Sequence, residues 1–156
     1  MIVLTGNPGV GVDNEAIIQA LSKLKDAVGD RVILTAGKMH ASGIISEAGE
    51  KILTEKDIVD FIDAGADMIL LPAPGTVPGI TMEYAGKLIK KAHEKGALAM
   101  TTIGTSQEGA DEDTIRQIAL MCKMAGADIH HIGDSGYMGM ALPENITAYS
   151  LSLIHI

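Results

Sequence analysis

Five short apolar runs, each followed by a glycine-bearing loop and then by a helical pattern, constrain the fold of this chain more than any other feature. The runs begin roughly 30–36 residues apart, which is the spacing of successive strands in βαβ units. They are Ile2–Thr5, Arg31–Ala36, Asp67–Pro72, Leu98–Ile103 and Asp128–Ile132. Apolar residues occupy both faces of each run, as expected of parallel strands with helices on one side and a core on the other. The sequence therefore predicts an α/β protein with a parallel sheet.

Helical patterns with capping signals separate these runs. Each begins after a residue that favours a helix N-terminus and ends at a glycine. The expected N-terminal residues are Asp13, Thr54, Thr81 and Asp111, and the terminal glycines are Gly29, Gly65, Gly96 and Gly126. The junction Ala-Gly-Ala-Asp occurs twice, at 64–67 and 125–128. Such repetition is typical of (β/α) barrels.

Two architectures fit this pattern. A closed (β/α)₈ TIM barrel needs eight strands and about 250 residues, whereas this chain has 156 residues. We therefore favour a partial TIM barrel over residues 1–150, with five parallel strands and four complete βα units that correspond to strands 4–8. A five-stranded doubly wound sheet is the alternative. Against it, every strand is followed by its own polar, glycine-bearing loop, and no junction is a distinct nucleotide-binding fingerprint.

The two ends of the chain carry a further expectation. Residues 151–156, with the sequence LSLIHI, are the translation of CTG TCT CTT ATA CAC ATC, the mosaic-end adaptor of transposase-based sequencing libraries. We expect these residues to be non-native and to have no part in function. The alternative is a natural final helix over Ala148–Ile156. Because Met1 opens directly on a strand, we expect the missing part of the barrel to be mostly N-terminal.

Composition narrows the range of partners. With 12 Lys and Arg against 20 Asp and Glu, the net charge is −8, which repels nucleic acid and anionic lipid. No apolar run reaches the roughly 18–20 residues of a membrane span, and the first residues do not form a signal peptide. We therefore expect a cytoplasmic protein that binds neither nucleic acid nor membranes. The single cysteine, Cys122, lies in an apolar helical pattern and is expected in the core.

The loops after the strands predict where an anionic small molecule binds. In barrels, ligand-binding residues lie at the carboxyl ends of the strands, and a phosphate often lies after the last two. The candidate phosphate-binding residues are Asn7, Gly9, Gly104, Thr105, Ser106, Gly133, Asp134, Ser135 and Gly136. Their amides and hydroxyls can donate to a phosphate or carboxylate, although Asp134 opposes an anion and can instead cap or orient a neighbour. For Asn7–Gly9, a tight turn that needs glycine is an equal alternative.

Lysine and histidine side chains supply the candidate catalytic groups. Lys38 and His40 follow the second strand. A lysine there can be a Schiff-base nucleophile, a general base or a phosphate clamp, and a histidine can shuttle protons. An exposed pair without a catalytic role is the alternative. His130 and His131 lie on the last strand, where alternation sends one side chain into the barrel and the other toward the helices. The inward histidine is a candidate acid–base group.

Two weaker features remain. The stretch Ala41–Thr54 is longer than a typical connection and predicts a lid over the site.

A divalent metal such as Mg²⁺ would need oxygen and nitrogen ligands, and the candidates are His40, His131, Glu47 and Asp134. Their spacing is not diagnostic, so the sequence does not decide whether the protein needs a cofactor.

Several of these loops carry longer motifs, which are TGNPG at 5–9, AGKMH at 36–40, LPAPGTVPGI at 71–80, GTSQEGAD at 104–111 and HHIGD at 130–134. With these motifs the chain resembles a family of bacterial TIM-barrel proteins that are labelled phosphoenolpyruvate phosphonomutase-like or haloacid-dehalogenase-like. The resemblance covers Ile2 to about Ser150. It implies a full-length barrel of roughly twice this length, of which this chain is the C-terminal half.

The same resemblance limits the reaction. Lys38-Met39-His40 is only loosely similar to the Lys-x-Cys-Gly-His motif of the phosphonomutase and isocitrate lyase superfamily, because the cysteine and the Glu-Asp-Lys metal motif are absent. A dehalogenase-type nucleophile must directly follow an apolar strand. Asp111 and Asp113 instead open a helix, so the dehalogenase label does not fit.

These features predict a TIM-barrel enzyme of isomerase or lyase type that acts on a small phosphorylated or carboxylated metabolite. Lys38, His40 and the inward histidine would transfer protons or activate a carbonyl group. The alternative is a non-catalytic ligand-binding or regulatory barrel with the same anion site. As an isolated half-barrel with an unpaired sheet edge, the chain itself is expected to be inactive and to form homo-oligomers.

Overall fold

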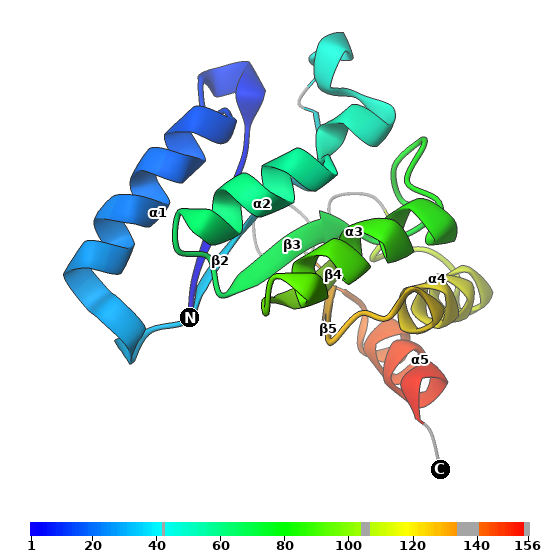
Figure 1. Ribbon diagram of the computed structural model, residues 1–156. Coiled ribbons are helices and arrows are strands. Elements are labelled where there is room, and N and C mark those ends of the chain that lie inside the picture. The colour runs from blue at the N-terminus through cyan, green and yellow to red at the C-terminus, as the bar shows by residue number, and fades with distance from the viewer. Residues whose placement is uncertain (42, 104–106, 134–140, 155–156) are drawn as a thin grey trace.

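Strands and α-helices alternate along the computed structural model, which describes residues 1–41, 43–103, 107–133 and 141–154 (Figure 1). The strands are β1 (Ile2–Thr5), β2 (Leu34–Gly37), β3 (Met68–Pro72), β4 (Leu98–Ile103) and β5 (Ile129–Ile132). The α-helices are α1 (Asn14–Val28), α2 (Glu55–Asp63), α3 (Met82–Glu94), α4 (Glu112–Ala125) and α5 (Pro143–Leu153). Short 3₁₀ turns lie in the connections: η1 (Pro8–Val10), η2 (Gly29–Arg31), η3 (Ile45–Glu47) and η4 (Gly49–Ile52).

The strands form one parallel sheet in which neighbours in the chain are neighbours in space. Their order is β1-β2-β3-β4-β5, and Gly37 of β2 lies opposite Thr5 of β1 and Leu70 of β3. A doubly wound sheet reverses its strand order at a switch point, and the described strands show no reversal. This is the order of consecutive units of a barrel, so the predicted partial TIM barrel is confirmed.

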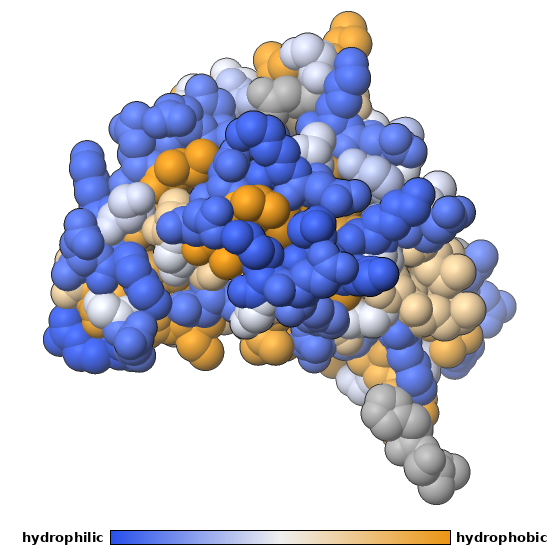
Figure 2. Space-filling view, viewed as in Figure 1, coloured by the Kyte–Doolittle hydropathy of each residue, from blue (hydrophilic) through white to orange (hydrophobic). Residues whose placement is uncertain are grey.

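The described helices cover one face of this sheet. On that face, Leu34, Ala36, Ile69, Leu71 and Ala99 pack against apolar side chains of α1, α2 and α3. A second cluster joins Ile103 to α4 and α5 and includes the fully buried Cys122, as the sequence predicted. The outer surface of the helices is mainly hydrophilic (Figure 2). Alternate strand residues form a separate cluster of Met68, Leu70 and Met100 with Met39 and Ile129. This inner face corresponds to the interior of a closed barrel.

The predicted helix N-termini are all present. The side chains of Asp13, Thr54, Thr81 and Asp111 each accept a hydrogen bond from a backbone amide in the first turn of the following helix. At α2 the bond is reciprocal, because the Asp57 carboxylate also accepts from the amide of Thr54 at 2.8 Å. Each such cap stabilises a helix by about 1 kcal/mol.

Three predicted strands have different bounds in the structure: β3 and β5 each begin one residue later than predicted, at Met68 and Ile129, and β2 spans Leu34–Gly37 instead of Arg31–Ala36. β2 begins at Leu34 rather than at Arg31, because residues 29–31 form the turn η2. There the Arg31 guanidinium donates to the carbonyls of Ala27 and Val28 at 2.8 and 3.0 Å, which caps the end of α1. In addition, α5 follows β5, so the described chain has one more strand–helix pair than the pattern predicted. This helix includes residues 151–153 of the segment that we expect to be non-native.

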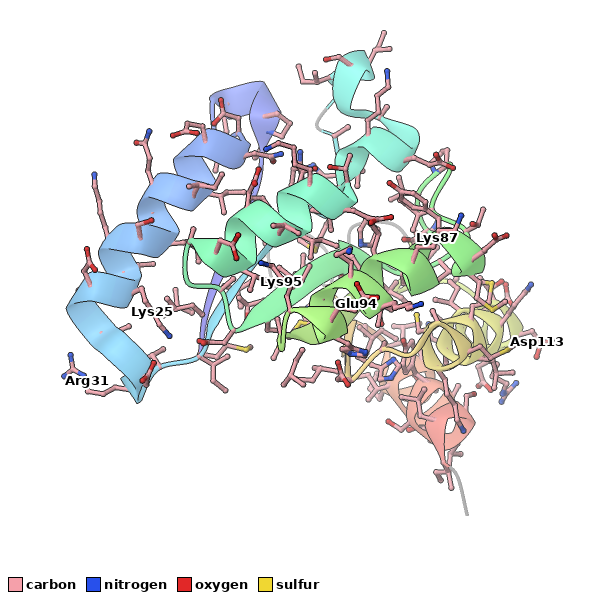
Figure 3. All side chains as sticks on the ribbon, in the orientation of Figure 1. Lys25, Arg31, Lys87, Glu94, Lys95 and Asp113 are labelled. Carbon is pink, nitrogen blue, oxygen red and sulfur yellow. The ribbon has the colours of Figure 1, made fainter. Side chains whose placement is uncertain are left out.

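At the amino end of the sheet, the first Ala-Gly-Ala-Asp junction forms a carboxylate clasp. The Asp67 carboxylate accepts a hydrogen bond from the amide of Leu34 at 2.9 Å, and it contacts at 3.2 Å the ammonium group of Lys25, which projects from α1 and is labelled in Figure 3. One side chain at the start of β3 therefore holds the first residue of β2 and the helix that precedes it.

The second junction repeats this clasp one pair of strands later. The Asp128 carboxylate accepts from the amide of Ala99 at 2.8 Å and contacts Nε2 of His93 on α3 at 2.8 Å. Burial acts to raise the pKa of Asp128, but the hydrogen bonds from His93 and Ala99 outweigh it and hold the pKa below its usual value. The repeated sequence motif thus has a repeated structural role.

No helix in the described ranges is long and apolar enough to cross a membrane.

Candidate functional site

The carboxyl ends of the strands share one edge of the sheet, and backbone pairing continues just beyond them. The Gly6 amide donates to the carbonyl of Gly37 at 2.9 Å, and the Ala73 amide donates to the carbonyl of Thr102 at 2.8 Å. The Gly133 amide donates to the carbonyl of Ile103 at 3.0 Å. The loops therefore start from a rigid platform. Because the amide of Gly133 is used in this pairing, it is not available to an anion, although the sequence placed it among the phosphate-binding candidates.

A concave site of about 350 Å³ lies on the inner face of the sheet. It is lined by Met1, Val3, Thr5, Met39, Leu70, Met100 and His131. His131 lies opposite Thr102 in the parallel register. Its Nδ1 atom is buried and has no hydrogen-bond partner among the described residues. His131 is thus the inward histidine that the sequence predicted without identifying, and its imidazole faces a space of the size of a small ligand.

His130 points the opposite way, toward the helices. Its Nδ1 lies 3.1 Å from the Tyr149 hydroxyl of α5, and the two rings meet edge to face with centroids 5.6 Å apart. Burial lowers the pKa of His130, against the opposing charge of Asp128, and burial also raises the pKa of the Tyr149 hydroxyl. These contacts make His130 a part of the packing between β5 and α5 and remove it from the inner face.

Lys38 follows β2 and is one of the most deeply buried side chains, with 1% of its surface exposed. Its aliphatic stem lies against Gly6, where an added Cβ atom would be 2.5 Å from Cγ and 2.8 Å from Cδ of the lysine. His40 is half-buried, and both side chains make interactions within the protein. Neither is an exposed group. Among the described residues, the His131 cavity is lined by Met39 and not by Lys38 or His40.

The loop after β1 is a closed turn. Asn7 and Val12 pair across it, and the amides of Val10 and Gly11 donate to Asn7 and Pro8. Gly11, with φ of 84°, is the residue that needs glycine, because its backbone is left-handed. The amides of Asn7, Val10 and Gly11 are therefore used within the loop, which favours the tight-turn alternative for this motif over an anion site at Asn7 and Gly9.

Several predicted site residues lie outside the described part of the chain. They are Gly104, Thr105 and Ser106 of the loop after β4, Asp134, Ser135 and Gly136 of the loop after β5, and the side chain of Glu47. The phosphate site stays a prediction. Within the described residues, no group of three His, Cys, Asp or Glu side chains is close enough to hold a metal ion.

The predicted lid contains the turns η3 and η4 between β2 and α2. Its base is fixed, because Ile52 and Leu53 are fully buried and the Tyr84 hydroxyl donates to the carbonyls of Glu50 and Leu53 at 2.9 and 3.1 Å. Ile45 in η3 is 89% exposed. The segment has the anchored base and the exposed apolar tip of a flap, and its closure stays a prediction.

Sequence reasoning missed Asn145, which lies on α5 and is 2% exposed. Its side-chain nitrogen Nδ2 donates to the carbonyl oxygens of Glu108 and Ala110 at 2.9 and 2.8 Å. The signal was present, because Asn145 shares a helical face with Ala148 and Tyr149, and all three are buried. A polar residue on an apolar face needs partners in the core.

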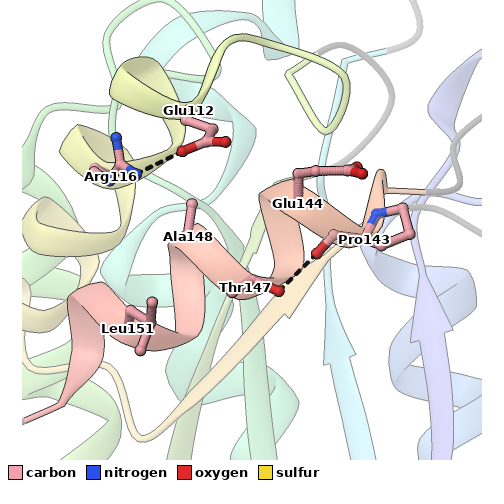
Figure 4. A pocket seen from close by; sticks show the side chains of 7 residues that line it. All are labelled: Glu112, Arg116, Pro143, Glu144, Thr147, Ala148 and Leu151. Carbon is pink, nitrogen blue, oxygen red and sulfur yellow. Dashed lines mark hydrogen bonds and ion pairs between the residues drawn. The ribbon is translucent and has the colours of Figure 1, made fainter.

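Among the other hollows of the described residues, the two larger ones lie to the side of the inner face. One, of about 600 Å³, is formed by residues 75–82 with Gln107 and Met121. The other, of about 400 Å³, is a groove between α4 and α5 in which Arg116 is bonded to Glu112 at 2.5 Å (Figure 4). Neither of these two hollows is lined by a histidine, so neither offers the imidazole that lines the inner-face cavity.

Residues 1–154 match the family model described as "Domain of unknown function (DUF7916)". The chain belongs to this family. The DUF7916 match runs through the whole described structure and includes residues 151–154 of the segment that we expect to be non-native.

Relatives of known name match a shorter stretch of the DUF7916 chain. A Haemophilus influenzae protein with the provisional name N-acetylmannosamine-6-phosphate 2-epimerase is 37% identical over 89 residues, which is 57% of this chain and 33% of that protein. A protein of the same provisional name from Actinobacillus pleuropneumoniae is 36% identical over the same extent. The alignment thus covers one third of the length of these relatives. Neither they nor the family description carries a phosphonomutase or dehalogenase label.

The fold is also that of a solved enzyme. Deoxyribose phosphate aldolase from Aeropyrum pernix, described as a unique tetramer, superposes with a TM-score of 0.58 at 14% identity. The superposition covers 97% of this chain and 69% of the aldolase. At this identity the likeness concerns the fold, and it agrees with the barrel order of the strands.

Proposed function

We propose that the DUF7916 chain supplies the carboxyl-end site of a TIM-barrel isomerase that moves a proton on a small phosphorylated metabolite. The observation that carries the proposal is the His131 imidazole, which faces a cavity of about 350 Å³ on the inner face with Nδ1 buried and unpartnered among the described residues. An imidazole that lines a cavity can act as a general acid or base in proton transfer, the role that histidine most often has in enzymes.

The cavity suits a small substrate with a polar end. Its floor is apolar, formed by Leu70, Met39 and Met100, and its polar groups are the Thr5 hydroxyl and the His131 ring. An apolar wall with a few polar groups at one end orients a ligand and excludes water from the reacting atoms. Proton abstraction next to a carbonyl is the chemistry that such a site supports best.

Phosphate as the anchoring group rests on two supports. The loops after β4 and β5 carry the glycines and hydroxyls of the sequence prediction, and barrels commonly place a phosphate there. The epimerase relatives are named for a sugar phosphate. Inversion at carbon 2, as that name describes, requires a proton to leave and return at one carbon, which is the role given to His131.

Lys38 has a supporting role in this proposal. Its buried stem at the end of β2 places a positive charge in a protein of net charge −8. A lysine held in this way attracts an anionic substrate as a point charge. Two parts of the sequence prediction have less support here. They are the lyase activity implied by the phosphonomutase-like label and a catalytic role for His40.

Hydrogen exchange from solvent tests this function directly. The chain is incubated with N-acetylmannosamine 6-phosphate in D₂O, and deuterium entry at carbon 2 is followed by NMR. Where exchange is observed, we expect His131→Gln to reduce its rate by about 100-fold or more, as removal of an acid–base group does. His93→Gln is the matched control, because His93 lies at the opposite end of the sheet, and it should leave the rate unchanged.

Each result separates the alternatives. Exchange that survives His131→Gln would remove His131 from catalysis. Saturable binding of the sugar phosphate without exchange, and without change between about pH 5 and 8, would favour the non-catalytic binding barrel, since histidine chemistry titrates in that range. Neither binding nor exchange would contradict both functions for this chain and would agree with the expected inactivity of an isolated half-barrel.

A further inference from the structure

The cavity beside His131 becomes apolar toward the amino ends of the strands. Leu70 and Met100, which line it, lie opposite each other in the parallel register of β3 and β4. Ile129 lies opposite Met100, so His131 stands two residues, or about 6.6 Å, nearer to the carboxyl ends. The imidazole therefore lies one step above a row of apolar side chains.

Apolar side chains dominate this lower part of the cavity. Val3 of β1 lines it, and Met39 packs against the buried cluster that contains Leu70 and Met100. Among the described residues that line the cavity, none is an acid, a lysine or an arginine. A phosphate group placed here would lose its hydration without a charged partner, which is costly. The lower part of the cavity therefore suits an apolar group of the substrate and not its phosphate.

A hydroxyl joins this row from the edge strand β1. Thr5 lies opposite Gly37, and Gly37 lies opposite Leu70, so Thr5 is in the same row as Leu70 and Met100, and it lines the same cavity. A hydroxyl can donate one hydrogen bond to a carbonyl oxygen, whereas the leucine and methionine side chains offer contact to carbon. The row therefore matches an acyl group, which has one acceptor oxygen and a short apolar chain.

We propose that Thr5, Leu70 and Met100 form a subsite for a short acyl group of the substrate, and that Leu70 and Met100 limit the length of this group. The substrate class is a phosphorylated metabolite that carries the acyl group beside the carbon that exchanges its proton. Three or four bonds of about 1.3–1.5 Å each take such a group from a carbon beside His131 into the row. The inference rests on the proposed function, because that function places the reacting carbon at His131.

Binding of a matched ligand series to the full chain tests the subsite, measured by calorimetry. The ligands are mannosamine 6-phosphates that carry an N-formyl, N-acetyl, N-propanoyl or N-butanoyl group and differ only in the length of that chain. We expect each carbon that enters the row to tighten binding by about fourfold, the effect of one buried methylene group, until the row is full. Equal affinity for all four ligands would overturn the inference.

Two variants test the residues of the row. Met100→Ala lengthens the row, so the chain length that binds most tightly should be greater than in the wild type. Thr5→Val keeps the size of the side chain and removes its hydroxyl. It should weaken the binding of all four ligands by about fivefold, the effect of one hydrogen bond, and leave the steps between them unchanged. Met121→Ala is the matched control and should keep the wild-type preference, because Met121 lines the hollow of residues 75–82 and not this cavity.

The outcomes separate a subsite from simple packing. If Leu70 and Met100 only pack the inner face, Met100→Ala lowers stability and leaves the preferred chain length unchanged, and this result would overturn the inference. The wild-type series needs no variant and covers the case in which Met100→Ala fails to fold. If none of the four ligands binds, the proposed function fails together with the subsite, whereas binding that does not depend on chain length removes the subsite alone.

Discussion

Replacement of Gly37 by alanine should destabilise this fold more than any exposed substitution, because β2 and β3 meet too closely there for a side chain. A Cβ atom on Gly37 would lie 1.7 Å from the carbonyl oxygen of Leu70 and 2.6 Å from its carbonyl carbon. Both are backbone atoms of the central strand β3, so no rotation of a side chain can relieve the clash. The strands themselves would have to move.

The size of that strand movement determines how much stability Gly37→Ala should cost. To restore even a 3.0 Å contact from 1.7 Å, β2 and β3 must separate by about 1.3 Å at this point. Hydrogen bonds of about 2.9 Å stretched by that amount are broken. Loss of two ladder bonds at about 1 kcal/mol each, added to an overpacking cost of about 1–3 kcal/mol, gives a loss of about 3–5 kcal/mol. This is a large part of the about 5–15 kcal/mol that stabilises a typical domain.

Urea unfolding followed by far-ultraviolet circular dichroism measures this loss, and it suits a chain that has no tryptophan. Gly109→Ala is the control, because a Cβ there meets nothing within 4 Å and the backbone is not left-handed. We expect the control to stay within about 0.5 kcal/mol of the wild type. A free energy of unfolding for Gly37→Ala within about 1 kcal/mol of the wild type would refute the close approach of β2 and β3.

Two other predictions concern hydrogen bonds on the helix-covered side. Tyr149→Phe removes the hydroxyl that lies 3.1 Å from Nδ1 of His130. It should lower the free energy of unfolding, measured in urea, by about 1 kcal/mol. An unchanged midpoint of urea unfolding would show that this contact contributes nothing to stability. The pKa of Asp128 is lowered in the fold by its bonds to His93 and Ala99, so its carboxylate stabilises the protein above about pH 4 and loses this effect as the pH falls through the lowered value. The stability difference between wild type and Asp128→Asn should therefore be larger at pH 7 than at pH 3, and a difference that grows toward acid pH would contradict the clasp.

The strands and helix starts could be predicted from the sequence because their signals are local. The predicted apolar run Leu98–Ile103 forms β4 with the same bounds. Thr54 precedes the acidic first turn of α2, and its side chain caps that helix. The start of β2 could not be predicted, since the guanidinium of Arg31 reaches back to α1 instead of entering the strand. A polar side chain that turns back to the carbonyls of the preceding helix leaves no trace in the hydrophobic periodicity.

The site was less predictable, because its members are defined by register and by contacts between loops. Alternation alone required one of His130 and His131 to face inward, but the choice depended on the pairing of β5 with β4 and on Tyr149, 19 residues away. Lys38 was identified as a site residue, but its burial against Gly6 depends on the neighbouring strand. Asn145 was missed, since its partners lie more than 30 residues earlier.

The carboxylate clasps at Asp67 and Asp128 fasten two of the strand pairs in the five-stranded sheet. Each clasp holds two adjacent strands at their amino ends, β2 with β3 and β4 with β5, whereas His131 lies near the carboxyl end of β5. We expect the Leu34 amide to exchange in step with β3 and the Ala99 amide in step with β5. Fastening at the amino ends allows mutations to change the loops at the carboxyl ends while the clasped strands keep their arrangement.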